Sequence, residues 1–143
     1  MGTARRNKPR NRRNKSRAVQ TQLDGIIFDS GAESRRYSEL KILEAAGEIL
    51  NLELQTPYEI KINGLLIGVY TPDFQYLDRD GITHCEDVKG IKMGDFSLRA
   101  RVIYALYPKI QWWVYVSGFK LAMCKVGKDS RVLTYRKPSR KSR

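Results

Sequence analysis

Residues 71–90 read TPDFQYLDRDGITHCEDVKG, and this stretch predicts the hairpin around which the fold is organised. Residues 74–77 and 82–89 are short runs rich in apolar side chains, and residues 78–81 between them have the Asp and Gly content of a tight turn. Successive side chains of a strand point to opposite faces of its sheet. The second run therefore has Cys85, Asp87 and Lys89 on one face, and His84, Glu86 and Val88 on the other.

Asp73 begins the first run of this hairpin, and Pro72 fixes the backbone just before it. The hairpin can bring Asp73 to the same rim as Asp87. Two neighbouring carboxylates repel each other, and a divalent cation relieves the repulsion while it gains hard oxygen ligands. Mg²⁺ keeps several waters, which leaves positions for a phosphate oxygen and an attacking water. We therefore expect a metal site at Asp73 and Asp87, with Lys89 orienting the water or stabilising developing charge.

A helix is expected upstream, over residues 31–46, after a brief extended segment at residues 23–29. Ser30 and Glu33 have the spacing of a capping box, and Gly47 stands where a C-terminal cap is expected. Four apolar side chains recur at helical spacing between them, namely Tyr37, Leu40, Leu43 and Ala46. Glu33 has two compatible interpretations: it caps the helix, or it completes the metal shell directly or through water.

The remaining residues predict a mixed central β-sheet flanked by helices, an α/β (α+β) domain. Turn residues such as Asn63-Gly64 and Pro108 separate the apolar runs. The expected elements are an extended segment at 52–62 bent at Pro57, a strand at 65–70, a helix at 96–107 capped by Asp95, a buried strand at 110–116 and a final hairpin of 121–126 with 132–136.

The charge is concentrated at the two ends of the 143-residue chain, whose net charge is +12. We predict one folded domain over residues 19–135, where bases and acids nearly balance, between a basic arm (1–18) and a basic tail (136–143). The arm contains Arg5, Arg6, Lys8, Arg10, Arg12, Arg13, Lys15 and Arg17, and the tail contains Arg136, Lys137, Arg140, Lys141 and Arg143. Such segments should be disordered alone and bind polyanions by counterion release. A localisation signal or simple solubility would also explain them.

Several classes of protein are excluded by composition. No run approaches the roughly 18 apolar residues of a membrane span. The basic N-terminus leads into polar residues, unlike a secretory signal. Cys85 and Cys124 are too few for a disulfide framework, and His84 alone does not supply a zinc site of the usual kind. We expect a cytoplasmic protein with free, buried thiols and no membrane partner.

The motifs resemble those of PD-(D/E)xK nucleases, and most closely those of the phage endonuclease I type of Holliday-junction resolvase and related small phage nucleases. The resemblance spans about residues 26–117 and ends with a helix that stops at Tyr107-Pro108 before a strand. Its segments are Phe28-Asp29-Ser30-Gly31-Ala32-Glu33, Tyr70-Thr71-Pro72-Asp73-Phe74 and Asp87-Val88-Lys89-Gly90. One departure is Asp87, where the endonuclease I type has Glu, although the wider motif permits either acid.

This resemblance implies a restriction-endonuclease-like core that hydrolyses DNA phosphodiesters with Mg²⁺ or Mn²⁺. Glu33, Asp73 and Asp87 would be metal ligands, and Lys89 would complete the catalytic set. The endonuclease I type also implies a homodimer that cuts branched DNA, in the host cytoplasm if a phage encodes the chain.

The sequence also offers further candidate DNA-contact residues and alternative functions. Lys92, Arg99 and Arg101 are candidates for phosphate contacts, but an exposed surface explains them almost as well. The aromatic side chains of the strand at 110–116 could stack on bases, although alternating burial is the better interpretation. The alternatives to a resolvase are a phage endonuclease that processes or degrades DNA without junction preference, and a nucleic-acid-binding protein without catalysis.

Overall fold

The computed structural model describes residues 20–88 and 93–135, with the backbone alone described at residues 93–95. The basic arm, the basic tail, Lys89 and Lys92 lie outside the described residues. In chain order the elements are β1 (Thr21–Leu23), β2 (Ile26–Phe28), α1 (Gly31–Ala45), β3 (Ile49–Leu54), β4 (Tyr58–Ile62), β5 (Leu65–Tyr70), β6 (Phe74–Asp78), β7 (Thr83–Val88), α2 (Met93–Leu106), β8 (Gln111–Val116), β9 (Phe119–Ala122), β10 (Cys124–Val126) and β11 (Val132–Thr134).

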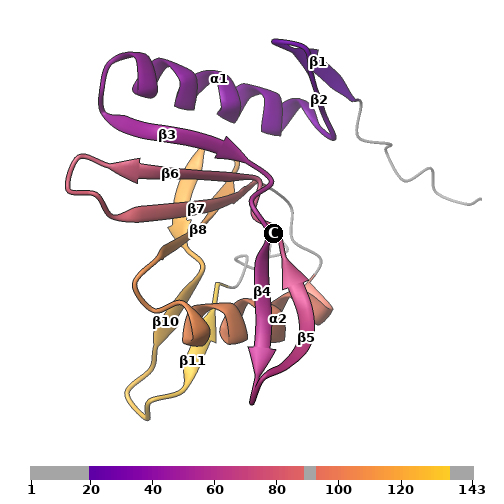
Figure 1. Ribbon diagram of the computed structural model, residues 1–143, viewed down its shortest axis with the longest axis vertical. Coiled ribbons are helices and arrows are strands. Elements are labelled where there is room, and N and C mark those ends of the chain that lie inside the picture. The colour runs from indigo at the N-terminus through magenta and orange to yellow at the C-terminus, as the bar shows by residue number, and fades with distance from the viewer. Residues whose placement is uncertain (1–19, 89–92, 136–143) are drawn as a thin grey trace, which may run out of the picture.

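The central sheet has five strands in the order β3-β6-β7-β8-β9. Neighbouring strands are antiparallel except β7 and β8, which are parallel because α2 connects them. The pairs β1-β2, β4-β5 and β10-β11 form separate two-stranded sheets. Figure 1 shows α1 along one end of the molecule and α2 with β4, β5, β10 and β11 at the other. The predicted α/β fold with a mixed central sheet is confirmed.

The β6–β7 hairpin has the predicted arrangement. Its register pairs Phe74 with Glu86 and Leu77 with Thr83. In its turn, Asp78 Oδ1 accepts hydrogen bonds from the backbone N–H groups of Asp80 and Ile82, both at 2.9 Å. Because Phe74 pairs with Glu86, extending the antiparallel register by one residue puts Asp73 opposite Asp87.

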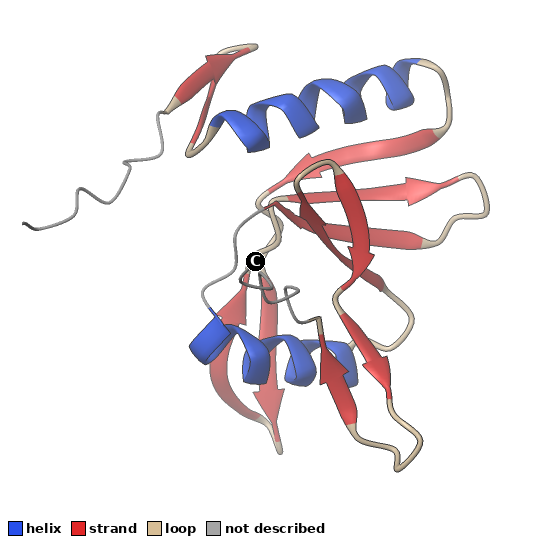
Figure 2. Cartoon of the chain, turned by 180° about the vertical axis from the view of Figure 1, so that it is seen from behind, coloured by secondary structure: helices blue, strands red, loops and turns tan. Residues whose placement is uncertain are grey.

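Two apolar clusters pack against the central sheet. One joins α1 to β6 and β7 and has Phe28, Tyr37, Leu40, Ile49, Phe74, Tyr76 and Val88 as its buried members. The other joins α2 to β7 and β8 and has Ile60, Tyr70, Cys85, Ala100, Ile103, Trp112, Val114, Met123 and Cys124. Figure 2 shows the two helices on separate sides of the strands. The predicted alternation is confirmed for the described residues of this strand, since Val88 and Cys85 belong to different clusters.

Glu86 is a charged side chain in the middle of this core, with none of its surface exposed. Arg36 of α1 binds it through two hydrogen bonds, from Nε to Oε2 at 2.7 Å and from a terminal nitrogen to Oε1 at 2.8 Å. Tyr76 donates a third, at 2.6 Å, and Lys120 Nζ lies 3.4 Å from Oε1. Burial alone would raise the pKa of Glu86, but these bonds outweigh it and hold the pKa below its ordinary value.

The helix at residues 31–46 is confirmed as α1. Ser30 Oγ accepts a hydrogen bond from the backbone N–H of Glu33 at 3.2 Å, and Gly47 follows the helix with φ of 72°. Positive φ suits glycine because it has no Cβ. The Asn63-Gly64 hairpin between β4 and β5 is also confirmed, with φ of 51° and 79° at its two turn residues.

Three expected boundaries are wrong. The extended segment at 52–62 divides at Pro57 into β3 and β4, which belong to different sheets, and β3 begins earlier, at Ile49. The strand expected at 121–126 also divides, because β9 completes the central sheet whereas β10 pairs with β11. The second helix begins at Met93, so Asp95 lies inside it and is not its cap.

We predict that the Arg36–Glu86 pair is strongly coupled. Arg36→Met leaves a buried carboxylate without its main partner, which should lower the free energy of unfolding by about 3–5 kcal/mol. The double variant Arg36→Met with Glu86→Gln should be destabilised less than the sum of the two single variants. Urea denaturation of all four proteins measures this, and strictly additive losses would show that the pair is not coupled.

The lowered pKa of Glu86 also predicts how stability depends on pH. An unfolded glutamate binds a proton near pH 4.3, whereas folded Glu86 binds it only at lower pH. The stabilisation is therefore complete above about pH 4.3 and is lost as the pH falls through the folded value. The stability difference between the wild type and Glu86→Gln should shrink between about pH 6 and about pH 3. A constant difference over this range would contradict the prediction.

Candidate functional site

Asp73 stands between β5 and β6 and ties three parts of the sheet together. It is 9% exposed. Its Oδ2 accepts a hydrogen bond from the backbone N–H of Val88 at 2.7 Å, and its Oδ1 accepts one from Gln55 Nε2 at 3.1 Å. Its carbonyl oxygen also accepts a bond from the Gln55 N–H at 3.2 Å. These bonds fix the carboxylate beside the end of β7.

Asp87 lies on the face of β7 that looks toward the α2 cluster. Its Oδ2 accepts a hydrogen bond from the hydroxyl of Tyr70, the last residue of β5. Tyr70 is 4% exposed, and the edge of its ring packs against Trp112. The phenol is therefore held by the core, and it fixes the carboxylate that the register sets opposite Asp73.

Glu33 stands in the first turn of α1, where the helix dipole favours negative charge. The side chain is 5% exposed. It lines a cavity of about 230 Å³ to which Asp73 also contributes. The full lining is Ile26, Ile27, Phe28, Asp29, Glu33, Leu54, Gln55, Asp73 and Phe74. The Ser30 hydroxyl caps the backbone N–H of Glu33, so this residue takes part in the helix cap and also lines the cavity with Asp73.

The structure separates Glu86 from this site. Its carboxylate lies under α1, bound by Arg36 and Tyr76, while Asp87 contacts Tyr70 on the other face. The choice of Asp87 over Glu86 as the partner of the motif lysine agrees with this arrangement. Lys89 itself, the fourth predicted catalytic residue, lies outside the described residues.

The donor chemistry fits a hard divalent cation. Glu33, Asp73 and Asp87 offer carboxylate oxygens, and each such oxygen has lone pairs to spare beyond one hydrogen bond. In residues 20–88 and 93–135, however, no three Asp, Glu, His or Cys side chains form a group that could hold a metal by themselves. A cation here would complete its shell with waters and phosphate oxygens, as Mg²⁺ usually does.

Two side chains of the site were not predicted from the sequence. Gln55 binds Asp73 through both its backbone and its side chain, and its φ of 55° lies in the left-handed region that β-carbons disfavour. Tyr70 belongs to a motif segment, but nothing in the sequence assigns it a role. Neither residue has a local signal, because the carboxylates they bind lie 18 and 17 residues away along the chain.

The predicted phosphate-contact residues of α2 do not line the cavity of Glu33 and Asp73. Arg99 and Arg101 are both exposed, and Arg101 Nε donates to the Ser97 carbonyl at 3.2 Å. Arg101 lines a second cavity, between α2 and the last two strands. Lys92 and the residues of the arm lie outside the described part of the chain.

The remaining candidates have structural roles. His84 stacks between the rings of Tyr76 and Trp113 and accepts a hydrogen bond from Trp113 Nε1 at 2.9 Å, on the face away from Asp87. Trp112 is buried and Trp113 partly so, which confirms alternating burial in that strand. Cys85 and Cys124 are free and buried, and burial raises the pKa of each thiol to about 11.

One comparison with known proteins identifies the family. The family model described as "Protein of unknown function (DUF1064)" matches residues 13–123. The chain belongs to this family. The DUF1064 match includes Glu33, Asp73, Asp87 and Lys89 and ends before β10. No curated protein and no solved structure matches the chain. Among the described residues of this DUF1064 member, neither helix is long and apolar enough to cross a bilayer.

We predict that the backbone of Gln55 is strained in the conformation that binds Asp73. Gln55→Gly and Gln55→Ala both remove the side-chain bond to Asp73, but only alanine keeps a β-carbon at positive φ. The glycine variant should therefore be more stable than the alanine variant by about 1–2 kcal/mol, as measured by urea denaturation. Equal stabilities, or a more stable alanine variant, would mean that this backbone conformation costs nothing.

Proposed function

We propose that this DUF1064 member is a metal-dependent endodeoxyribonuclease that hydrolyses phosphodiester bonds of DNA. The observation that carries the proposal is the register of the β6–β7 hairpin, which sets Asp73 opposite Asp87. The cavity shared by Glu33 and Asp73 supports it, since it adds a third carboxylate from a different element. The net charge of +12 supports a polyanionic substrate.

Each side chain has a distinct task in this proposal. Glu33, Asp73 and Asp87 would hold Mg²⁺ or Mn²⁺, while Gln55 and Tyr70 orient the carboxylates that they contact. When bound, the cation would acidify water and neutralise negative charge at the phosphate. Lys89, assigned by resemblance to the PD-(D/E)xK motif, would position the attacking water or stabilise developing charge.

The substrate we favour is branched DNA such as a Holliday junction. The support is the resemblance to the endonuclease I type. A resolvase makes two coordinated cuts and one chain has one such site, so we propose a homodimer. The protein would act in the cytoplasm, and in the host cytoplasm if a phage encodes it.

The decisive variants are Asp87→Asn and Asp73→Asn. Asp87→Asn removes the charge but keeps an oxygen that can accept the Tyr70 bond, so the fold should survive. Asp73→Asn is the harsher change, because Asp73 uses both oxygens in hydrogen bonds. Each should reduce Mg²⁺-dependent cleavage by more than about 100-fold, beyond the loss typical of a residue that only supports a metal ligand. DNA affinity should change little, because neither carboxylate contacts phosphate directly.

Asp80→Asn is the matched control, since Asp80 is exposed in the turn at the far end of the same hairpin. It should cleave as the wild type does. Cleavage of four-way junctions and of matched linear duplexes, at equal salt, then identifies the substrate class. Equal rates would indicate a nuclease without junction preference. Undiminished cleavage by Asp87→Asn would reject the active site, and binding without cleavage by the wild type would leave a nucleic-acid-binding protein without catalysis.

A further inference from the structure

The part of the chain that the structure describes is divided into an acidic and a basic half. Residues 20–88 contain 13 Asp and Glu against 5 Lys and Arg. Residues 96–135 contain 7 Lys and Arg against a single acid, Asp129. Arg131 binds that one acid. The net charge of the whole domain is therefore near zero although its two halves have opposite net charges.

The asymmetry is also spatial. The acidic half comprises β1 to β7 with α1, and the basic half comprises α2 and β8 to β11. Of the acidic half, β4 and β5 lie at the same end as α2 (Figure 1), and their one acid, Glu59, is paired with Lys61. In Figure 1, α1 lies at the end of the molecule opposite α2, β10 and β11. A polyanion such as DNA is repelled by one end of the domain and attracted by the other, which orients its approach.

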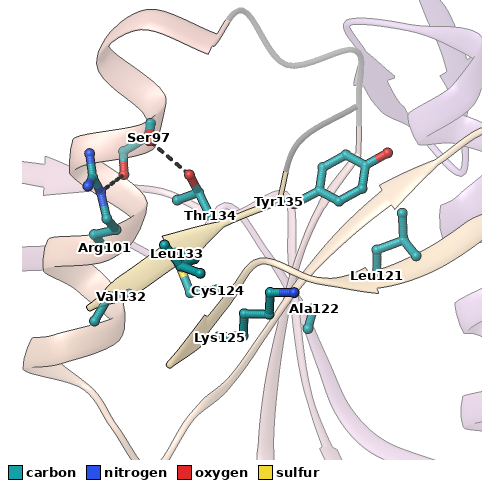
Figure 3. Close-up of a pocket in the computed structure, with 10 residues that line it drawn as sticks. All are labelled: Ser97, Arg101, Leu121, Ala122, Cys124, Lys125, Val132, Leu133, Thr134 and Tyr135. Carbon is teal, nitrogen blue, oxygen red and sulfur yellow. Dashed lines mark hydrogen bonds between the residues drawn. The ribbon is translucent and has the colours of Figure 1, made fainter. Parts of the chain in front are cut away.

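The basic half contains the larger cavity, of about 980 Å³. Figure 3 shows it between α2 and the β10–β11 hairpin. The Ser97 and Thr134 hydroxyls are 2.8 Å apart and join the two elements. The lining residues are Ser97, Arg101, Leu121, Ala122, Cys124, Lys125, Val132, Leu133, Thr134 and Tyr135, with no acid among them.

The cations of this surface are exposed and spread over two elements. Arg101 comes from α2 and Lys125 from β10, and Lys128 is exposed in the turn that follows. A small anion is best bound by donors that converge on one point. Separated, exposed cations instead suit a chain of phosphates, because each neutralises its own phosphate and releases its own counterion.

We propose that Arg101, Lys125 and Lys128 form a binding surface for the phosphate backbone of duplex DNA. This surface is separate from the carboxylate site and lies in the folded domain, beyond the basic arm and tail. The inference rests on the proposed function only in taking DNA as the ligand, and it does not require cleavage. Val132 and Leu133 line the cavity between helix and hairpin together with Arg101 and Lys125.

The test is the salt dependence of duplex binding, measured with the full chain and a chelator present so that no cleavage occurs. Lys125→Gln with Lys128→Gln removes two exposed charges without touching the core. The slope of log affinity against log salt should become shallower by roughly 0.9 for each phosphate that the variant no longer neutralises. An unchanged slope would overturn the proposal, whether or not inorganic phosphate binds in the cavity.

Lys41→Gln with Arg79→Gln is the matched control, because both side chains are exposed but lie in the acidic half, paired with Glu44 and Glu48. This double variant should keep the wild-type slope. If the slope of the control becomes as shallow as that of the test variant, the change reflects only the net charge of the protein. That result would reject a local binding surface. Cleavage by Asp87→Asn is measured separately, so the binding surface and the nuclease site can fail independently.

Discussion

The burial of Glu86 beneath α1 is the constraint on which the rest of the structure depends. A carboxylate with no exposed surface is tolerated only because Arg36 binds both of its oxygens and Tyr76 binds one of them. Side chains alternate along a strand, so a β7 that turns Glu86 toward α1 must turn Asp87 toward Tyr70. A slip of one residue would turn Glu86 toward the α2 cluster, away from Arg36, and would turn Asp87 toward α1, away from Tyr70. The ion pair thus fixes both the helix–sheet contact and the direction of the site carboxylate.

In the candidate site, hydrogen bonds between segments that are distant in the chain hold the carboxylates in place. Asp73 is held by Val88 and Gln55, and Asp87 by Tyr70, so each carboxylate is oriented before any cation binds. Such pre-orientation favours metal binding because less conformational freedom is lost on association. The acidic half that contains these carboxylates would repel DNA by itself. In the proposed function, the basic surface of α2 and β10 would offset that repulsion and let DNA approach the acidic site.

Helix caps and tight turns were predicted well from the sequence, but the pairing of distant strands was not. The α1 helix and the hairpins at Asn63-Gly64 and residues 78–81 were predicted because caps and turns act over three or four residues. The segment 52–62 was expected to be one extended element, but its two parts joined different sheets at Pro57. The strand at 121–126 divided for the same reason. Strand partners are chosen by packing and register, which hydrophobic pattern alone does not specify.

The sequence by itself determined which acids could form the site and which face of β7 each one occupies, because strand alternation is a property of the local backbone. It also determined the charge of the chain, including the asymmetry between its two halves. Only the tertiary structure decided that Gln55 and Tyr70 hold the carboxylates, that Glu33 shares a cavity with Asp73, and that Arg36 neutralises Glu86. The hydrogen bonds among these residues join positions 17 to 50 apart in the chain. No local rule specifies such pairs, because they depend on how helices and strands pack.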